Sequence, residues 1–219
     1  MLVVIGNVLD PHEVEALREL AEEVPFEDGR NTAGRYAREV KSNLQAGPSA
    51  ARDAIFAKVQ AALESNEVFR AAARPREFAR LLLSRYEPGM EYGLHVDDPI
   101  MHGQRTDLSF TLFLSDPATY EGGGLVMDDP LEQRLIRLNA GDVVLYPSNT
   151  LHSVAPVVSG QRLAVVGWVT SWVRDPARRE ILYDLDVATQ ETFNALGKTP
   201  AFDRLLKAKS NLYRMWAEG

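Results

Sequence analysis

The sequence predicts an α+β protein with a mainly β core, a sandwich or jelly roll braced by helices at its N-terminal end. Three observations predict it: helical periodicity in two segments before residue 66, short strands separated by turns from Phe78 onward, and a return of helical signals at Asp175-Pro176. We therefore expect one domain over 1–174 and a small helical segment over 175–219.

The N-terminal part opens with a short apolar strand and two helices. Asp10-Pro11-His12-Glu13 has the order of an N-cap, a first-turn proline and a capping-box glutamate, so a helix should begin there and run to about Val24. Pro48-Ser49 opens a second helix, with apolar residues at helical spacing through Leu63. These helices are expected to brace one face of a sheet.

The middle of the chain alternates short apolar runs with turn signals such as Pro88-Gly89, Gly122-Gly123, Asp129-Pro130 and Ser159-Gly160. This spacing is typical of a sandwich or a jelly roll. The expected strands are 78–86, 108–114, 125–127, 131–138, 143–146, 152–158 and 163–169.

After Asp175-Pro176 the pattern predicts one helix to about Leu196, a break at Gly197 and a last helix from Thr199-Pro200. The last helix carries one apolar stripe that ends in Trp216. Such a stripe indicates core packing or a homodimer contact.

Composition narrows the function. A formal charge of -7 and a pI near 5.2 disfavour nucleic acid as a partner, because phosphate binding needs a basic surface. No apolar run is long enough to span a membrane and no signal peptide is recognisable, so a cytoplasmic protein is expected. With no cysteine, any metal must be held by nitrogen and oxygen ligands.

Histidine spacing points to a metal centre. In an extended chain His95 and Asp97 share a face while Asp98 points away, and an antiparallel fold can return His152 beside His95. A lone His-x-Asp is weak evidence, and its ordinary role is a surface ion pair or a turn. With His152, two imidazoles and one carboxylate match the facial triad of non-haem Fe(II) oxygenases, which leaves positions open for a 2-oxo acid and O2.

Arg162 follows His152 by ten residues. If 158–160 forms a three-residue hairpin loop, Arg162 pairs opposite Pro156 and faces inward, where its guanidinium can bind the distal carboxylate of a five-carbon diacid. Without the triad it would be a solvated hairpin arginine. Further candidates for contact with this cosubstrate are Tyr86, Ser109, Thr111 and Trp168, although such residues in strands often report only β-propensity.

Several longer motifs resemble those of the PKHD-type hydroxylases, relatives of the prolyl and lysyl hydroxylases within the Fe(II)/2-oxoglutarate dioxygenases. The resemblance covers nearly the whole chain. Its motifs are Glu27-Asp-Gly-Arg-Asn-Thr-Ala-Gly34, Val40-Lys-Ser-Asn-Leu-Gln45, Tyr92-Gly-Leu-His-Val-Asp97, Arg105-Thr-Asp-Leu-Ser109, Thr111-Leu-Phe-Leu-Ser115, Ala140-Gly-Asp-Val-Val-Leu-Tyr-Pro-Ser148, Leu151-His152, Gly160-Gln-Arg162 and Leu182-Tyr-Asp-Leu-Asp186.

The resemblance implies a double-stranded β-helix with catalytic His95, Asp97, His152 and Arg162, the first three binding Fe(II) and the last binding 2-oxoglutarate. It also implies oxidative decarboxylation of 2-oxoglutarate by O2, coupled to hydroxylation of a protein prolyl side chain, another side chain or a small metabolite. Ascorbate is a further cofactor that it suggests. Two departures, Gly124 before Leu125 and Thr170 after the strand residue Trp168, touch none of these residues.

Two other functions are open on the sequence. A cupin-like metal enzyme without 2-oxoglutarate would keep the fold, but it would leave Arg162 without a task. A non-catalytic sensor of iron or 2-oxoglutarate would keep the whole site and turn nothing over.

Overall fold

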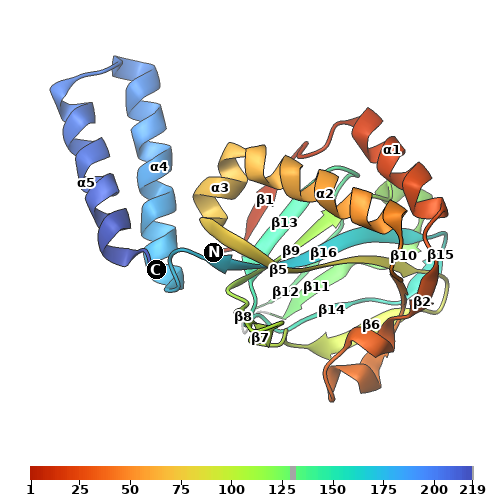
Figure 1. The fold of residues 1–219 in the computed structure, drawn as a ribbon. Coiled ribbons are helices and arrows are strands. Elements are labelled where there is room, and N and C mark those ends of the chain that lie inside the picture. The colour runs from red at the N-terminus through yellow and green to blue at the C-terminus, as the bar shows by residue number, and fades with distance from the viewer. Residues whose placement is uncertain (129–131, 219) are drawn as a thin grey trace.

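Two antiparallel sheets face each other in a computed structural model that describes residues 1–128 and 132–218 (Figure 1). The larger sheet has the order β1-β13-β9-β16-β5-β4-β2 and the smaller one β12-β11-β14-β6-β3. The sheets confirm the jelly roll. Their strands are β1 Val3–Ile5, β2 Phe26–Asp28, β3 Lys41–Ser42, β4 Leu44–Ala46, β5 Pro75–Tyr86, β6 Glu91–His95, β9 Leu108–Phe113, β11 Leu125–Asp128, β12 Gln133–Ile136, β13 Val143–Pro147, β14 His152–Val154 and β16 Arg162–Ser171.

Two small ribbons complete the β structure: β7 Ile100–Met101 with β8 Gln104–Arg105, and β10 Glu121–Gly122 with β15 Val157–Ser159. Short 3-10 turns lie at Gly29–Thr32, Ala37–Val40 and Pro117–Thr119. The predicted turn at Asp129-Pro130 and the start of the predicted strand at Leu131 lie outside the described residues.

Helices α1 Pro11–Glu22, α2 Ala50–Ser65 and α3 Glu67–Ala73 cover the outer face of the larger sheet (Figure 1). The predicted capping box is present, since the Glu13 amide donates to the Asp10 carboxylate and the Asp10 amide donates to the Glu13 carboxylate. The main apolar core lies between these helices and the sheet, so the inner face of the sheet is not part of this core. The sequence did not predict α3, which begins at its own N-cap, Asn66, directly after α2.

Beyond the sheets the chain ends in a hairpin of α4 Pro176–Leu196 and α5 Pro200–Trp216, with the predicted break at Gly197 (Figure 1). A partly buried ion pair between Arg74 and Asp186 ties this hairpin to the end of α3. Among the described residues, no helix combines the length and the hydrophobicity that crossing a membrane requires.

The predicted register of Arg162 was wrong, although its inward direction was right. Arg162 does not pair with Pro156, because β14 belongs to the smaller sheet and β16 to the larger one. The chain changes sheets between the two strands, and Arg162 instead lies opposite Tyr86 on β5. A local hairpin argument could not include this change of sheet.

Gly160 occupies the turn that delivers β16 to the larger sheet. Its φ of +74° is in the left-handed region, and an added Cβ would lie 2.2 Å from the carbonyl oxygen of Thr119. Gly89 also has a positive φ, +85°, but an added Cβ there would meet nothing within 4 Å. Substitutions at the two glycines therefore distinguish the cost of backbone strain from the cost of a steric clash.

Gly160→Ala should therefore lower the free energy of unfolding by about 3 kcal/mol, from strain plus displaced backbone. Gly89→Ala, the matched control, should cost only about 1 kcal/mol, since strain alone acts there. Urea denaturation followed by circular dichroism measures both. Equal losses in the two variants would show that the contact with Thr119 is relieved without cost.

Candidate functional site

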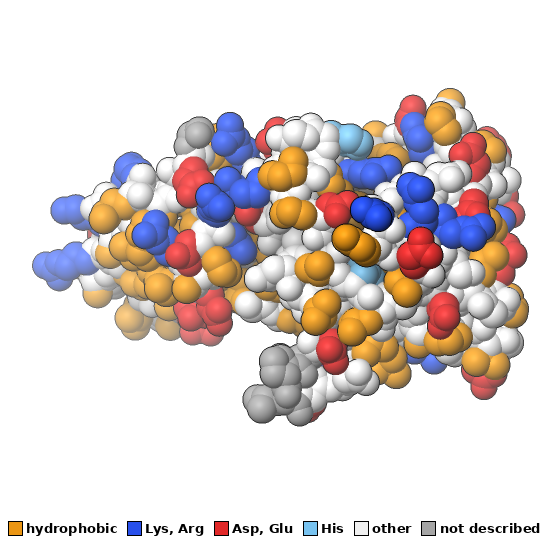
Figure 2. Space-filling model, turned by 90° about the horizontal axis from the view of Figure 1, so that it is seen from below, with side chains coloured by type: hydrophobic (Ala, Val, Ile, Leu, Met, Phe, Trp, Pro, Cys, Tyr) orange, Lys and Arg blue, Asp and Glu red, His pale blue; other side chains and the backbone are white. Residues whose placement is uncertain are grey.

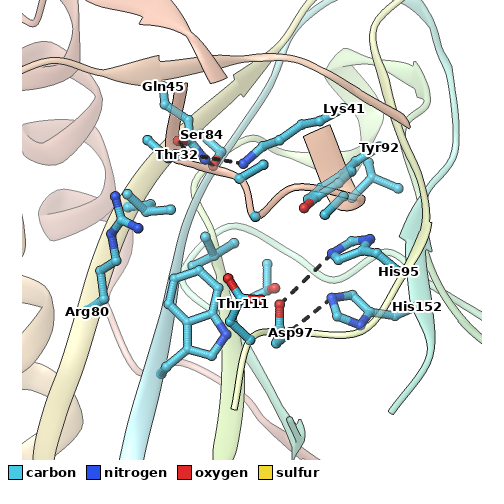
Figure 3. A pocket seen from close by; sticks show the side chains of 18 of the residues that line it. Thr32, Lys41, Gln45, Arg80, Ser84, Tyr92, His95, Asp97, Thr111 and His152 are labelled. Carbon is cyan, nitrogen blue, oxygen red and sulfur yellow. Dashed lines mark hydrogen bonds and ion pairs between the residues drawn. The ribbon is translucent and has the colours of Figure 1, made fainter. Parts of the chain in front are cut away.

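The two sheets enclose a cavity in which His95, Asp97 and His152 converge (Figure 3). Strands β6 and β14 pair so that His152 lies opposite His95. The centroids of the two imidazole rings are 4.3 Å apart. One Asp97 oxygen lies 4.0 Å from His95 Nε2 and the other lies 3.9 Å from His152 Nε2. The structure thus brings together the three residues that the sequence predicts as metal ligands.

Both imidazoles are fixed in the tautomer that a metal requires. His95 Nδ1 donates to the Gly93 carbonyl at 2.8 Å and His152 Nδ1 donates to the Thr150 carbonyl at 2.9 Å. The Nε2 lone pairs therefore face the shared space. Burial, together with the neighbouring His152 ring, lowers the pKa of His95 to about 4, so this imidazole is neutral at pH 7.

Aromatic rings hold the two histidines in place. The Tyr92 ring stacks on His95 with a centroid distance of 3.6 Å, and Tyr146 packs edge-on against His152 at 5.2 Å. Tyr92 and His95 both face inward because the pairing of β6 with β14 shifts register between them, as in a β-bulge. Strict alternation along the strand would have turned one of them outward.

A hydroxyl chain orients the carboxylate. The Ser109 hydroxyl donates to Asp97 at 2.6 Å, and the Ser148 hydroxyl lies 2.8 Å from Ser109 Oγ. Because an ionised carboxylate only accepts, Ser109 must give its single proton to Asp97 and accept from Ser148. The sequence suggested a cosubstrate contact for Ser109, but its proton is engaged by Asp97.

Asp98 was predicted to point away from the face that His95 and Asp97 share, and it is not part of the group formed by His95, Asp97 and His152. Strand β6 ends at His95, so the alternation of side chains that supported the prediction does not extend to residue 98. Asp98 lines the same cavity as Asp97.

Arg162 lies at the buried end of this cavity with 1% of its surface exposed. Its guanidinium carbon is 5.2 Å from the centroid of the Tyr86 ring and 5.4 Å from that of Phe113. Its Nε and Nη1 atoms are buried and make no hydrogen bond with any described residue. A buried charge of this kind is costly unless an anion meets it.

The other predicted cosubstrate contacts fall in different places. Thr111 and Trp168 line the cavity, whereas Tyr86 lies behind Arg162, buried, with its pKa raised by burial. Counted with its mouth and the open solvent there, the cavity has an empty volume of about 750 Å³.

Sequence reasoning assigned no individual role to several residues that line the cavity, among them Lys41, Arg80 and Tyr92. Arg80 precedes Tyr86 by an even number of residues on one predicted strand, which places both on one face. That signal was available. Lys41 gave no such signal, because its position depends on the pairing of β3 with β6, a strand about 50 residues further along the chain.

Comparison with known proteins agrees with this arrangement. Residues 81–170 match the family model described as 2OG-Fe(II) oxygenase superfamily, and residues 176–218 match the PKHD-type hydroxylase C-terminal domain. A PKHD-type hydroxylase of Maricaulis maris is 49% identical over 218 residues and covers 100% of both chains. One from Parvibaculum lavamentivorans is 52% identical over 198 residues, or 90% of each chain.

Solved structures share the fold. A Pseudomonas putida prolyl-4-hydroxylase covers 78% of this chain and 92% of its own, with a TM-score of 0.52 and 20% identity. HygX from Streptomyces hygroscopicus, solved with nickel and 2-oxoglutarate bound, covers 78% and 84% with a TM-score of 0.58 and 15% identity. At these identities the likeness concerns the fold alone.

Ser109→Ala should weaken binding of Mn(II), used in place of Fe(II), by about 10- to 100-fold, because Asp97 loses the donor that orients it. Isothermal titration calorimetry under argon measures the affinity. Ser153→Ala is the matched control, since Ser153 follows His152 on β14 and does not line the cavity. An unchanged affinity in Ser109→Ala would mean that Asp97 needs no such support.

Proposed function

The chain belongs to the PKHD-type hydroxylases of the 2OG-Fe(II) oxygenase superfamily, and we propose which of its residues carry the activity. It is a dioxygenase that uses Fe(II) and takes 2-oxoglutarate and O2 as cosubstrates. In our proposal His95, Asp97 and His152 hold the iron and Arg162 binds the distal carboxylate of 2-oxoglutarate. The bond hydroxylated is a C–H of a protein prolyl side chain, another side chain or a small metabolite.

The observation that carries the proposal is the unpaired guanidinium of Arg162. Two of its nitrogens are buried without a partner among the described residues, and it opens onto the cavity of the histidine cluster. A carboxylate would satisfy them bidentately. The cupin-like alternative without 2-oxoglutarate gives this buried charge no counterion.

The cluster suits Fe(II). Two imidazole nitrogens and a carboxylate oxygen lie within 4.8 Å of one another, and the described residues offer no fourth histidine or acid to this group. This donor set leaves coordination positions open and matches the preference of non-haem Fe(II). When bound, the iron supplies the redox chemistry that couples decarboxylation of 2-oxoglutarate by O2 to hydroxylation of a C–H bond.

The chain's own part is binding and orientation. The rings of Tyr86 and Phe113 hold the Arg162 guanidinium against the cavity floor. Burial keeps Tyr86 a neutral phenol behind Arg162. Thr111 and Trp168 line the cavity, where their hydroxyl and indole N–H can each donate to a cosubstrate oxygen. The surrounding apolar side chains of Leu82 and Val166 limit access of water.

We also propose that the chain divides into an oxygenase domain over 1–174 and a helical segment over 175–219. The family models support this division, because one ends at residue 170 and the other begins at residue 176. Support for a prolyl substrate is limited to the fold, which is shared with the prolyl-4-hydroxylase of P. putida and with a prolyl hydroxylase of Trichoplax adhaerens.

His152→Ala should abolish turnover of 2-oxoglutarate to succinate in air with Fe(II), because the metal loses a ligand. Arg162→Gln should raise the KM for 2-oxoglutarate roughly 100-fold, as expected when the charge facing a buried carboxylate is lost. Succinate is quantified by mass spectrometry without added substrate. His12→Ala, an exposed histidine on α1, is the control and should match the wild type.

Wild-type activity in His152→Ala would contradict the ligand set, and an unchanged KM in Arg162→Gln would contradict the role of Arg162. If the wild type binds both iron and 2-oxoglutarate but forms no succinate, the result would favour the alternative function, a non-catalytic sensor of iron or 2-oxoglutarate. The same assay with and without ascorbate tests whether ascorbate stimulates the enzyme.

A further inference from the structure

The cavity holds two cations that the proposed function does not use, Lys41 and Arg80 (Figure 3). Lys41 is buried, with 6% of its surface exposed, and its ammonium makes one hydrogen bond, to Thr32 Oγ1 at 3.2 Å. Arg80 is half-buried on β5 and makes no hydrogen bond or ion pair with any described residue. Both charges lack the counterion that burial normally demands.

Arg80 and Arg162 lie at opposite ends of the cavity. On paired strands Arg162 is opposite Tyr86 and Trp168 is opposite Arg80, so the two arginines are separated by about 20 Å of strand. The Arg162 guanidinium stays at its own end, between the rings of Tyr86 and Phe113. A five-carbon diacid held by Arg162 therefore leaves Arg80 without a partner.

A row of neighbouring residues links Arg80 to the metal cluster. Asp97 is bonded to Ser109, Ser109 is opposite Trp168, and Trp168 is opposite Arg80, which places these residues in one row across three strands. At a strand spacing of about 4.8 Å the row is short. Arg80 thus faces the part of the cavity next to the metal cluster that the cosubstrate does not fill.

Lys41 enters this same part from the smaller sheet. It pairs with Tyr92, its ammonium lies 4.8 Å from the Tyr92 ring centroid, and that ring stacks on His95. Figure 3 shows its side chain beside Thr32 and Gln45, with Arg80 reaching in from β5. Burial, and then the charge of Arg80, lowers the pKa of Lys41 to about 8.

The charges around the cavity do not balance. Lys41, Arg80 and Arg162 are positive and Asp97 and Asp98 are negative. Fe(II) and the dianion of 2-oxoglutarate cancel each other, so the loaded site keeps one positive charge in excess, three against two. Asp98 acts on Arg80 through space but forms no ion pair with it. This local excess of positive charge is opposite in sign to the net charge of the whole chain, -7.

We propose that Lys41 and Arg80 form an oxyanion subsite, and that the substrate carries a carboxylate or another oxyanion close to the carbon that is hydroxylated. This inference rests on the proposed function, since it takes the metal cluster as the place of reaction. Lys41 and Arg80 then determine substrate specificity, because a neutral analogue would leave two cations facing each other without a counterion.

The test compares acid and amide pairs as probes of the subsite. N-acetylglycine, N-acetyl-L-glutamate and N-acetyl-L-proline are each titrated beside their amides into protein loaded with Mn(II) and 2-oxoglutarate under argon, and N-acetyl-O-phosphoserine is titrated beside N-acetylserine. At least one acid should bind 10-fold or more tightly than its neutral partner. The phosphoserine pair tells whether a phosphate or a carboxylate is preferred.

Lys41→Gln and Arg80→Gln should each reduce that preference at least 10-fold, whereas Lys41→Arg and Arg80→Lys should keep it. Lys58→Gln and Arg76→Gln remove an exposed lysine and an arginine of β5 that lie outside the cavity lining, so they are the matched controls. Thermal melting checks that every variant is folded. If a glutamine variant does not fold, the charge-keeping variants and the acid preference of the wild type still decide.

Two results would overturn the proposal. One is a wild type that binds no acid better than its neutral partner. The other is a loss of 2-oxoglutarate affinity in Lys41→Gln and Arg80→Gln as large as that in Arg162→Gln, which would assign both cations to the cosubstrate. Failure of the proposed function is separate, because it would appear as absent succinate formation in wild type with Fe(II) and air.

Discussion

The central constraint on this molecule is that charged groups must be kept inside it without counterions. Arg162 is almost fully buried with two unpaired nitrogens, and Lys41 has a single neutral hydrogen-bond partner. Burial of such groups opposes folding unless other parts of the structure compensate. The arrangement of the two sheets separates the apolar core, which stabilises the fold, from the cavity, which holds the buried charges.

The larger sheet makes this separation. Its outer face packs on α1, α2 and α3 (Figure 1) and forms the main apolar core. Its inner face presents Arg162, Trp168 and Arg80 to the cavity. A second, smaller apolar cluster between the sheets surrounds the buried end of the cavity. Figure 2 shows the molecule from below, where basic, acidic and apolar side chains lie next to a histidine. The outer core therefore carries most of the apolar stabilisation, and the inner face is free to carry polar groups.

The sequence predicted the jelly roll and the convergence of His95 and His152 because these depend on the return of antiparallel strands. Asp97 joins them as predicted, although β6 ends at His95 and strand alternation does not direct it. The sequence also predicted that Arg162 faces inward, but through a pairing with Pro156 that does not exist. Nothing in the sequence showed that β6 ends at His95, three residues before Asp98. No individual role could be assigned to Lys41, since its place follows from a long-range pairing that no short pattern encodes.

Positioning of the metal cluster depends on features that oppose ideal β geometry. The register shift between β6 and β14 lets Tyr92 and His95 share a face, and Asp97 follows the end of β6, where it can turn toward Ser109. A regular, longer β6 would satisfy more backbone hydrogen bonds, but it would direct Asp97 by strand alternation rather than by the hydroxyl chain. The early end of β6 is also what brings Asp98 into the cavity beside Asp97. The register shift and the early end of β6 therefore assemble the donor set together, and beyond that strand end Asp98 adds a negative charge to the cavity lining.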